Sequence, residues 1–517
     1  MFFTMEPGPF PPMHNRLVPC FQHNKAFQQT LKVVLGGILS LLTGCLVGPK
    51  YQTPVATLET PPPAYKESPT QFKDGTEWKV ARPQDAMLRG PWWRIFKDPE
   101  LNVLEDQLNI NNQNIKQFFE NFMEARALIA EANAQLYPTL TANASYTKSG
   151  AGIAPPLSSI LTVLQASWEP DLWGKFRNAL RSAQYSAQLS AADLANEQLS
   201  AQASLATFVF QIRGQDALEK VLKDTIVADQ KALDYNRAQY ETGITDQISV
   251  VEAENTLQNV QAAATNIGVA RAQFEHAIAV LTGRVASNFS IPVRVLDSSP
   301  PPVPIGVPSE LVERRPDVAA AERTMAAENA QIGIAYAAYF PTVTINGERG
   351  FHNSSAAELF NDRSRIWSIG PSISETIFDA GLRTATVHQD IAIYNADLAA
   401  YRQSVLTAFQ QVEDGLAQVR IFSKQLIQQR AAEQSAHQFL KLEIARYQTG
   451  IDPYIDVVTA QNTLLTDQQA VVTIQVDAMT GAVALIKALG GGWDKSQLPS
   501  PHEVSKSPTR EETAIQH

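Results

Sequence analysis

Cysteine is almost absent from this chain of 517 residues: Cys20 and Cys45 are the two cysteines, and both lie near the N-terminus. A disulfide scaffold or a cysteine-ligated zinc site is therefore excluded for the remainder of the sequence. The eight histidines are scattered, with no HExxH motif and no paired spacing. Because the sequence shows no nucleophile–base pair, metal cluster or phosphate-binding loop, it predicts neither an enzyme nor a metal centre.

Positive charge is also in short supply. Charged residues make up 18% of the chain, and the formal net charge is −10. The sequence has no basic patch and no basic residues interleaved with aromatic ones, so a nucleic-acid partner is excluded. The long stretches are instead rich in alanine, glutamine and asparagine.

A long hydrophobic run is missing near the N-terminus. The apolar run Val33–Leu42 is too short for a permanent membrane-spanning helix, but it fits the hydrophobic part of a secretory signal. It leads into Leu42–Cys45, which looks like a bacterial lipobox and implies cleavage before Cys45 followed by acylation. The alternative is an ordinary signal peptide with an incidental cysteine. Three possible start codons stay open, Met1, Met5 and Met13.

What the sequence does contain is an internal duplication. The stretch Arg237–Leu257 recurs as Ala445–Leu464, and matched residues such as Tyr240 and Tyr447 are separated by one constant offset (447 − 240 = 207). A gapless self-match of this kind indicates two copies of one structural unit. Each copy has a Thr-Gly turn with long helical sequence on both sides, which predicts the tip of a helical hairpin.

Both hairpins are predicted to be very long. Residues Lys175–Thr242 contain no proline and one glycine, with alanine and leucine at helical spacing. A helix from about Leu172 to Tyr240 would be roughly 100 Å long, more than a compact domain needs. Small residues on two faces favour a helix with a neighbour on each side, as in the wall of a tube. A plain two-stranded coiled coil is the alternative.

Each repeat also contains two segments with the alternation of short β-strands. These segments are Thr139–Tyr146, Leu161–Trp168, Thr342–Arg349 and Ile366–Thr376. Four strands cannot close a membrane barrel, and an open sheet edge cannot sit in lipid, so the chain is expected to oligomerise around one shared barrel. The alternative is two ordinary hairpins in a soluble α+β protein.

The predicted organisation has six parts. They are a signal peptide (1–44), an acylated tether (45–91), a first repeat (92–283), a proline-rich linker (284–308), a second repeat (309–492) and a disordered tail (493–517). One uninterrupted helix is expected from Asp98 to about Leu136. Trp92 and Trp93 are interpreted as packing residues rather than as a ligand site.

Several motifs together resemble one family, the bacterial outer membrane factors or TolC-like channels, and within it the NodT-type efflux lipoproteins. Each motif is weak alone, but their order and the duplication are highly specific and cover almost all of residues 45–492. The motifs are the lipobox with Cys45–Pro54, Trp92–Pro99, Trp168–Lys175, Arg314–Val318 with Ala320–Glu322, Phe378–Gly381, and the two Tyr-x-Thr-Gly tips.

The resemblance implies a homotrimer that combines a transmembrane β-barrel with an α-helical barrel, closed only as a trimer. Twelve strands would cross the outer membrane and a twelve-helix tunnel would cross the periplasm, four of each per chain. A covalent lipid on Cys45 would be the one attached group, with no other cofactor. The implied function is a passive export duct whose partners are outer-membrane lipid, a periplasmic adaptor and an inner-membrane RND-type transporter.

The resemblance also implies roles for the two tips, where charged and tyrosine side chains would hold the pore shut and turn residues would dock the adaptor. The gate residues are Tyr240, Asp246, Tyr447, Asp452 and Asp456, and the docking residues are Thr242, Gly243, Ile244, Thr449, Gly450 and Ile451. In this hypothesis, Asp246, Asp452 and Asp456 of three subunits form acidic rings that select cations and raise their own pKa values by repulsion.

Simpler interpretations of the tips stay open. The carboxylates could merely favour the positive ends of the return helices, and the glycines could serve only the positive φ of the turn. Asp452 stands where better-studied relatives carry a basic residue, so an Asp–Arg latch of their kind is not expected. Because Ser249 replaces the acid that matches Asp456, the second copy is predicted to carry most of the gating.

Two other functions are alternatives to the duct: a hydrolase anchored to the envelope, and a structural coiled-coil lipoprotein that tethers envelope layers. The hydrolase lacks recognisable catalytic residues, and a tether does not need the strand pairs. Drugs, solvents, metal ions and siderophores all stay open as the exported substrate, and several adaptors and pumps stay open as partners.

Overall fold

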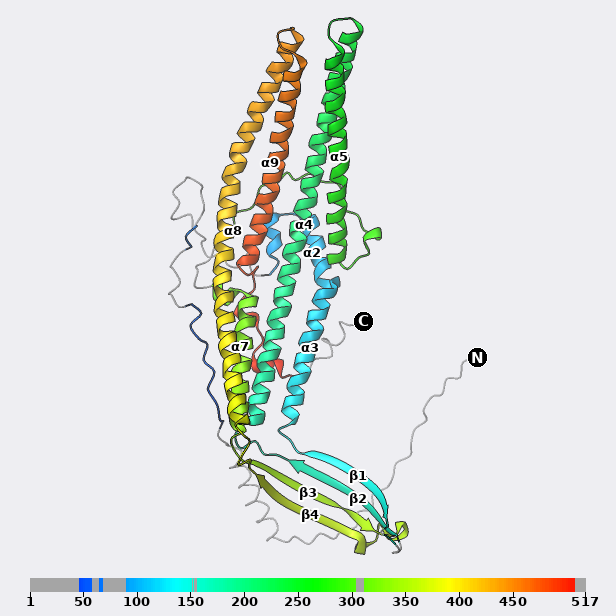
Figure 1. Ribbon diagram of the computed structural model, residues 1–517, viewed down its shortest axis with the longest axis vertical. Coiled ribbons are helices and arrows are strands. Elements are labelled where there is room, and N and C mark those ends of the chain that lie inside the picture. The colour runs from blue at the N-terminus through cyan, green and yellow to red at the C-terminus, as the bar shows by residue number, and fades with distance from the viewer. Residues whose placement is uncertain are drawn as a thin grey trace, which may run out of the picture.

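The computed structural model describes residues 46–57, 65–67, 90–150, 152, 156–303 and 311–506. Two long helical hairpins extend to one end of the molecule, a single sheet forms the other end, and shorter helices lie between them (Figure 1). The predicted signal peptide and the acylated Cys45 lie outside the described residues, as do parts of the tether, the linker and the tail.

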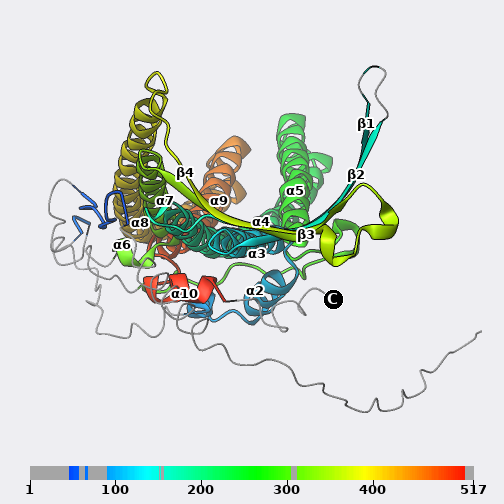
Figure 2. The same cartoon turned by 90° about the horizontal axis from the view of Figure 1, so that it is seen from below.

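The sheet consists of four antiparallel strands in the order β1-β2-β3-β4. The strands span Thr139–Ser149 (β1), Leu157–Trp168 (β2), Thr342–Asn353 (β3) and Arg365–Ser374 (β4). The four predicted strands are confirmed, with ends that differ by a few residues. The sheet is curved, and β1 and β4 are its two open edges (Figure 2).

The two faces of the sheet differ in polarity. On one face, Asn143 donates to Gln165 Oε1 at 2.8 Å and Ser167 donates to Asn346 Oδ1 at 2.9 Å. The opposite face carries large apolar side chains that are exposed in the single chain, among them Leu140, Leu164, Trp367, Ile369 and Ile373. The register keeps the two sets apart, because successive side chains of a strand point to opposite faces.

Four long helices form the two hairpins. The first hairpin pairs α4 (Lys175–Glu241) with α5 (Gln247–Leu281), and the second pairs α8 (Leu382–Gln448) with α9 (Tyr454–Ala488). At about 1.5 Å per residue, the 67 residues of α4 and of α8 each extend roughly 100 Å. The hairpins meet through α4 and α9. Helix α9 is apolar enough by composition to cross a membrane, but half of its apolar window is buried in the protein.

Shorter helices continue the hairpins toward the sheet. They are α2 (Pro99–Asn111), α3 (Gln113–Ala134), α6 (Leu311–Arg314) and α7 (Pro316–Ala337). The prediction of one uninterrupted helix from Asp98 to about Leu136 is wrong, because the helix is interrupted at Asn112. This residue caps α3 by accepting from Ile115 N at 3.0 Å, and it donates to Leu281 O at the end of α5 at 2.9 Å. A contact with a distant helix thus sets a boundary that the local sequence does not reveal.

A buried polar network joins the linker to the helices at mid-height. Arg213 of α4 is 4% exposed and forms an ion pair with Asp98, and burial lowers the pKa of this guanidinium to about 10. Nearby on α4, Asp216 accepts from Arg271 Nε at 2.6 Å and from the backbone amide of Arg294 at 2.8 Å. The network therefore holds the linker after α5 against α4.

The main apolar core lies beside this network. Trp92 and Trp93 are 1% and 5% exposed, and their rings make an edge contact with centroids 5.9 Å apart. The Trp92 indole also donates to Gln202 Oε1 at 3.2 Å. The interpretation of this tryptophan pair as packing residues is confirmed.

Of the tail predicted to be disordered (493–517), the described residues 493–506 are ordered, and that part of the prediction is wrong. The described part, up to residue 506, includes a short 3-10 turn, η7 (Lys495–Gln497), and α10 (Pro501–Val504), which lies against α4. Val504 is 1% exposed, and Arg126 donates to the Lys506 carbonyl oxygen at 2.7 Å. The polar composition of residues 493–506 predicts disorder, but helix caps and backbone hydrogen bonds keep this segment ordered.

Candidate functional site at the helical tips

Each hairpin ends in a short turn that reverses the chain. We call residues 242–246 the first tip and residues 449–453 the second tip. In both tips a glycine with positive φ, 74° at Gly243 and 72° at Gly450, follows the long helix. The amide of the next residue donates to a carbonyl five residues earlier. This is the Schellman arrangement, in which glycine avoids the steric cost of the left-handed conformation.

The residues predicted to dock an adaptor lie at the extreme end of the molecule. Ile244 is 72% exposed and Ile451 is 66% exposed. The threonine hydroxyls bond back to the carbonyl four residues earlier, at 3.1 Å for Thr242 and 3.0 Å for Thr449. The tips thus present apolar side chains on well-bonded turns, while the docking role itself stays a prediction.

Tyr447 connects the two hairpins close to the tips. Its hydroxyl donates to Asn236 Oδ1 at 2.5 Å and lies 3.0 Å from Gln239 Oε1, and both acceptors are on α4. Its ring contacts Tyr454 of α9 with centroids 5.2 Å apart. Tyr454 is 4% exposed and packs in an apolar cluster with residues of α4 and α5. Both tyrosines therefore contribute to the contact between the hairpins.

The second tip contains an ion pair that the sequence did not predict. Arg446, in the last turn of α8, pairs with Asp452 through two contacts, one of them from Nη2 to Oδ1 at 2.9 Å. Arg446 holds the pKa of Asp452 below its ordinary value. Within one chain this pKa is therefore lowered, while the rise expected from acidic rings of three subunits stays a prediction. The first copy has Gln239 in place of Arg446, so the same pair cannot form there.

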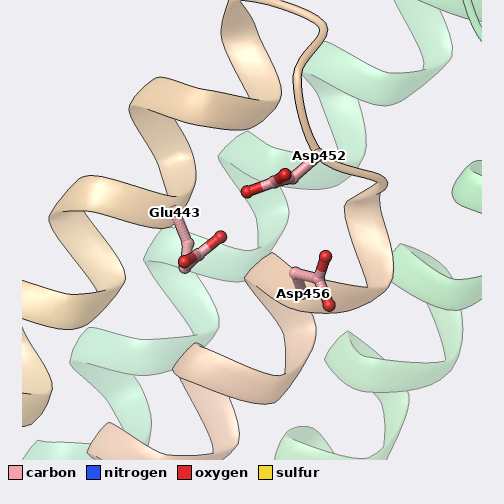
Figure 3. A group of neighbouring side chains, drawn as sticks. All are labelled: Glu443, Asp452 and Asp456. Carbon is pink, nitrogen blue, oxygen red and sulfur yellow. The ribbon is translucent and has the colours of Figure 1, made fainter.

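Three carboxylates gather beside this ion pair (Figure 3). One oxygen from each of Glu443, Asp452 and Asp456 lies within 4.8 Å of the others, and the three side chains are half-buried. Burial and the neighbouring Asp452 raise the pKa of Glu443. Such oxygens are the ligands that hard cations prefer. Because Arg446 already compensates Asp452, the cluster by itself does not define a metal site.

Asp246 and Tyr240 do not belong to this cluster, and Asp246 and Asp456 both lie at helix ends. Asp246 is the N-cap of α5 and accepts from the Ser249 amide at 3.1 Å, as the simpler interpretation requires. Asp456 lies in the first turn of α9, where the helix dipole favours an acid. Tyr240, which matches Tyr447 in the repeat, is 47% exposed. The acidic rings depend on neighbouring copies and stay a prediction.

Sequence reasoning missed Asn236, Gln239 and Arg446. The first two lie three residues apart on α4, so they share the face that meets Tyr447. A position-by-position comparison of the two copies could have found Arg446, because a charged residue replaces Gln239 there.

The open sheet, with one polar and one apolar face, and the long hairpins together define a class of protein. The chain is a subunit of a membrane channel with a helical conduit. A sequence model of the family described as Outer membrane efflux protein matches residues 104–284 and 307–491, more than half of the chain. The chain belongs to this family. The two matched spans reflect the internal duplication.

Relatives and solved structures cover most of the chain. Probable efflux pump outer membrane protein TtgC of Pseudomonas putida is 30% identical over 467 residues, which cover 88% of this chain and 94% of TtgC. Outer membrane protein OprJ of Pseudomonas aeruginosa is 29% identical over 86% of this chain and 95% of its own length. The outer-membrane channel OprN matches with a TM-score of 0.79 at 28% identity, over 87% of this chain and 100% of OprN. The CmeC channel of Campylobacter jejuni has a TM-score of 0.81 at 21% identity, over 91% of this chain and 99% of CmeC, and supports the fold alone.

These findings confirm the predicted family and fold class. The chain is an outer-membrane efflux channel that extends into the periplasm. The family consists of efflux channels, which are transporters rather than enzymes.

Proposed function

We propose that three copies of this chain close one duct through the outer membrane and the periplasm. The observation that carries the proposal is the four-stranded sheet, which has two unpaired edges and continues into helices roughly 100 Å long. Unpaired backbone groups cannot face lipid, so β4 of one copy pairs with β1 of the next. Three copies then supply twelve strands (3 × 4) around one pore.

The polarity of the sheet supports this arrangement and distinguishes its inside from its outside. The face that carries Asn143, Gln165 and Glu348 lines the aqueous lumen, since these side chains hydrogen-bond along it. The face that carries Trp367 and Ile369, each more than 70% exposed in the single chain, contacts lipid.

The proposal includes an acyl anchor on Cys45. The next residue, Leu46, lies where the sheet meets the helices: a Cβ added to Gly174 would come within 2.6 Å of it. The amide of Val47 donates to Trp173 O at 3.1 Å. The residues that directly follow the proposed anchor therefore lie against the segment between β2 and α4. Mass spectrometry of the mature N-terminus tests this anchor, and Cys45→Ser is expected to lose the lipid.

Partners and cargo complete the proposal. Exposed Ile244 and Ile451 on the tips suit an apolar contact with a periplasmic adaptor, which joins the duct to an inner-membrane transporter of the RND type. Relatives carry names that refer to toluene, antibiotic and solvent efflux. Small organic compounds are therefore the proposed cargo of this chain.

The duct is tested with purified protein in detergent and in a planar bilayer. We expect a trimer that migrates differently after heating and that produces conductance steps on reconstitution. A stable monomer without conductance would contradict the proposal and would fit a coiled-coil tether instead.

A further inference from the structure

Asp229 lies in the seam where the first hairpin meets the second. The seam positions of α4 follow one another at alternating spacings of four and three residues, Leu222, Ile226, Asp229, Leu233 and Asn236. Residues at these spacings share one face of a helix. Leu233 belongs to an apolar cluster that also contains Tyr454 of α9. The face that carries Asp229 is therefore the one that contacts the second hairpin.

The two polar residues of this seam differ in their bonding. Asn236 is fully buried, but it donates to Ala232 O at 2.9 Å and accepts from Tyr447. Asp229 is 2% exposed, and neither of its carboxyl oxygens has a hydrogen-bond partner in the described part of the chain. Burial raises the pKa of Asp229 from 3.8 to about 6. A buried carboxyl without a partner favours its protonated form.

Among the residues that the structure describes, the groups that act on Asp229 supply no opposite charge. Tyr454 of α9 is close enough that Asp229 contributes to the raised pKa of its phenol. Glu252 of α5 and Tyr447 of α8 act on the same phenol. These neighbours are two neutral phenols and a second acid, so an ionised Asp229 would gain no attraction from them.

The internal repeat shows that the seam does not need an acid at this position. The equivalent of Asp229 in the second hairpin is Ala436 (229 + 207 = 436), which is 5% exposed. A small apolar side chain therefore satisfies the packing of a hairpin of the same length. Packing alone therefore does not require the ionisable carboxyl that Asp229 brings to the first hairpin.

We propose that Asp229 is a proton-binding switch, which locks the two hairpins together when it is neutral and loosens their contact when it is ionised. The effect of this switch on transport rests on the proposed duct, because separation of the two hairpins would open the duct at the tips. Acidification of the periplasm would thus favour the closed tips.

The direction of the pH dependence follows from proton linkage. In the loosened form the carboxyl meets water and titrates at its ordinary value, whereas burial raises the pKa of Asp229 in the closed form. The preference for the closed form is therefore full below about pH 4, weakens up to about pH 6, and changes no further above that. Two pH units correspond to a roughly 100-fold change in the ratio of closed to loosened hairpins.

Spin labels at the last residues of α4 and α8, next to the two tips, test the switch directly. Cysteines replacing Glu241 and Gln448, which are both exposed, would report the separation of the tips in the full-length assembly. We expect the separation to grow as the pH rises from about 4 to about 6 and then to level off. Asp229→Asn keeps the shape without the charge, and should hold the acid-form separation at every pH.

Two further variants complete the test. Asp229→Ala copies the residue of the second hairpin and should behave as Asp229→Asn does. Asp224→Asn removes an exposed carboxylate of the same helix, whose side chain is 68% exposed, and should leave the titration unchanged. A separation that does not change with pH in the unaltered chain, or a titration that persists in Asp229→Asn, would overturn the switch. Conductance is recorded in parallel: its complete absence would overturn the duct, while the label distances still decide the switch.

Discussion

The hydroxyl of Tyr447 donates a hydrogen bond to Oδ1 of Asn236 at 2.5 Å and thereby connects α8 to α4. Asn236 is fully buried, and its amide nitrogen is already bonded to Ala232 O. Without the phenol, the Asn236 oxygen would stay buried and unpaired. Tyr447 therefore supplies the one hydrogen bond that satisfies the Asn236 oxygen in the described part of the chain, beside the apolar contacts of Tyr454.

Tyr447→Phe is expected to loosen the tips. Leaving the buried acceptor of Asn236 without its donor costs about 1–3 kcal/mol. Hydrogen exchange should become faster in the last turns of α4 and α8, and the open probability in a bilayer should rise. Tyr240→Phe is the matched control, because Tyr240 occupies the same repeat position and is 47% exposed. Equal effects of the two substitutions would contradict the role of Tyr447.

Arg446→Gln copies the residue of the first copy and is expected to speed hydrogen exchange at the second tip alone. The pKa of Asp452 is depressed by Arg446, so the contribution of this ion pair is present above about pH 4 and is lost as the pH falls further. The variant and the unaltered chain should therefore converge in acid. Adding Asp452→Asn should reverse part of the effect, because it removes the carboxylate that has lost its partner. No recovery in the double variant would contradict the pairing.

Arg213→Met is expected to destabilise the centre of the molecule. It leaves Asp98, which is 4% exposed, as a buried carboxylate that has lost its main partner. Removing one member of a buried pair costs about 3–5 kcal/mol. Thermal denaturation and the yield of assembled protein measure the loss. Lys220→Met is the control, because its ion pair with Asp224 is exposed at 2.6 Å and should contribute little. If Arg213→Met left the thermal stability and the yield unchanged, the buried polar network would be dispensable.

Gly350→Ala is expected to disrupt the pairing of β2 and β3. A Cβ at this position would lie 2.1 Å from Thr162 O and 2.7 Å from Val163 Cα, and both obstacles are backbone atoms. The amount of heat-modifiable assembly in the outer membrane should fall sharply. Gly347→Ala on the same strand should be tolerated, since the nearest atom is 3.8 Å away. If both variants assembled equally, the close packing at Gly350 would have no consequence.

Much of the fold could be predicted because it depends on local pattern and on repetition. Proline-free segments with helical spacing became α4 and α8, and alternating segments became the four strands. The break at Asn112 and the docking of α10 could not be predicted in this way. Each depends on a hydrogen bond to a partner far along the chain, Leu281 O for Asn112 and Arg126 for the Lys506 carbonyl.

At the tips, too, the local sequence predicts some features, while others depend on residues farther along the chain. The Thr-Gly turns, the exposed isoleucines and the capping role of Asp246 follow from residues within one turn of each other. Arg446 was not recognised as the partner of Asp452, because the two are six residues apart on opposite sides of a tight turn. The resemblance implies a gate role for Tyr447, but its acceptor Asn236 lies 211 residues away, so the local sequence does not predict their hydrogen bond.

By itself, the sequence determined the duplication, the length of the helices, the four strands and the resemblance to an efflux channel. These features arise from side-chain periodicity and turn chemistry, which act between near neighbours. Only the tertiary structure decided which polar side chains of the seam are bonded and which is not. Asn236 and Asp229 occupy equivalent positions of one helical face, and burial against the second hairpin makes one a paired amide and the other an isolated carboxyl.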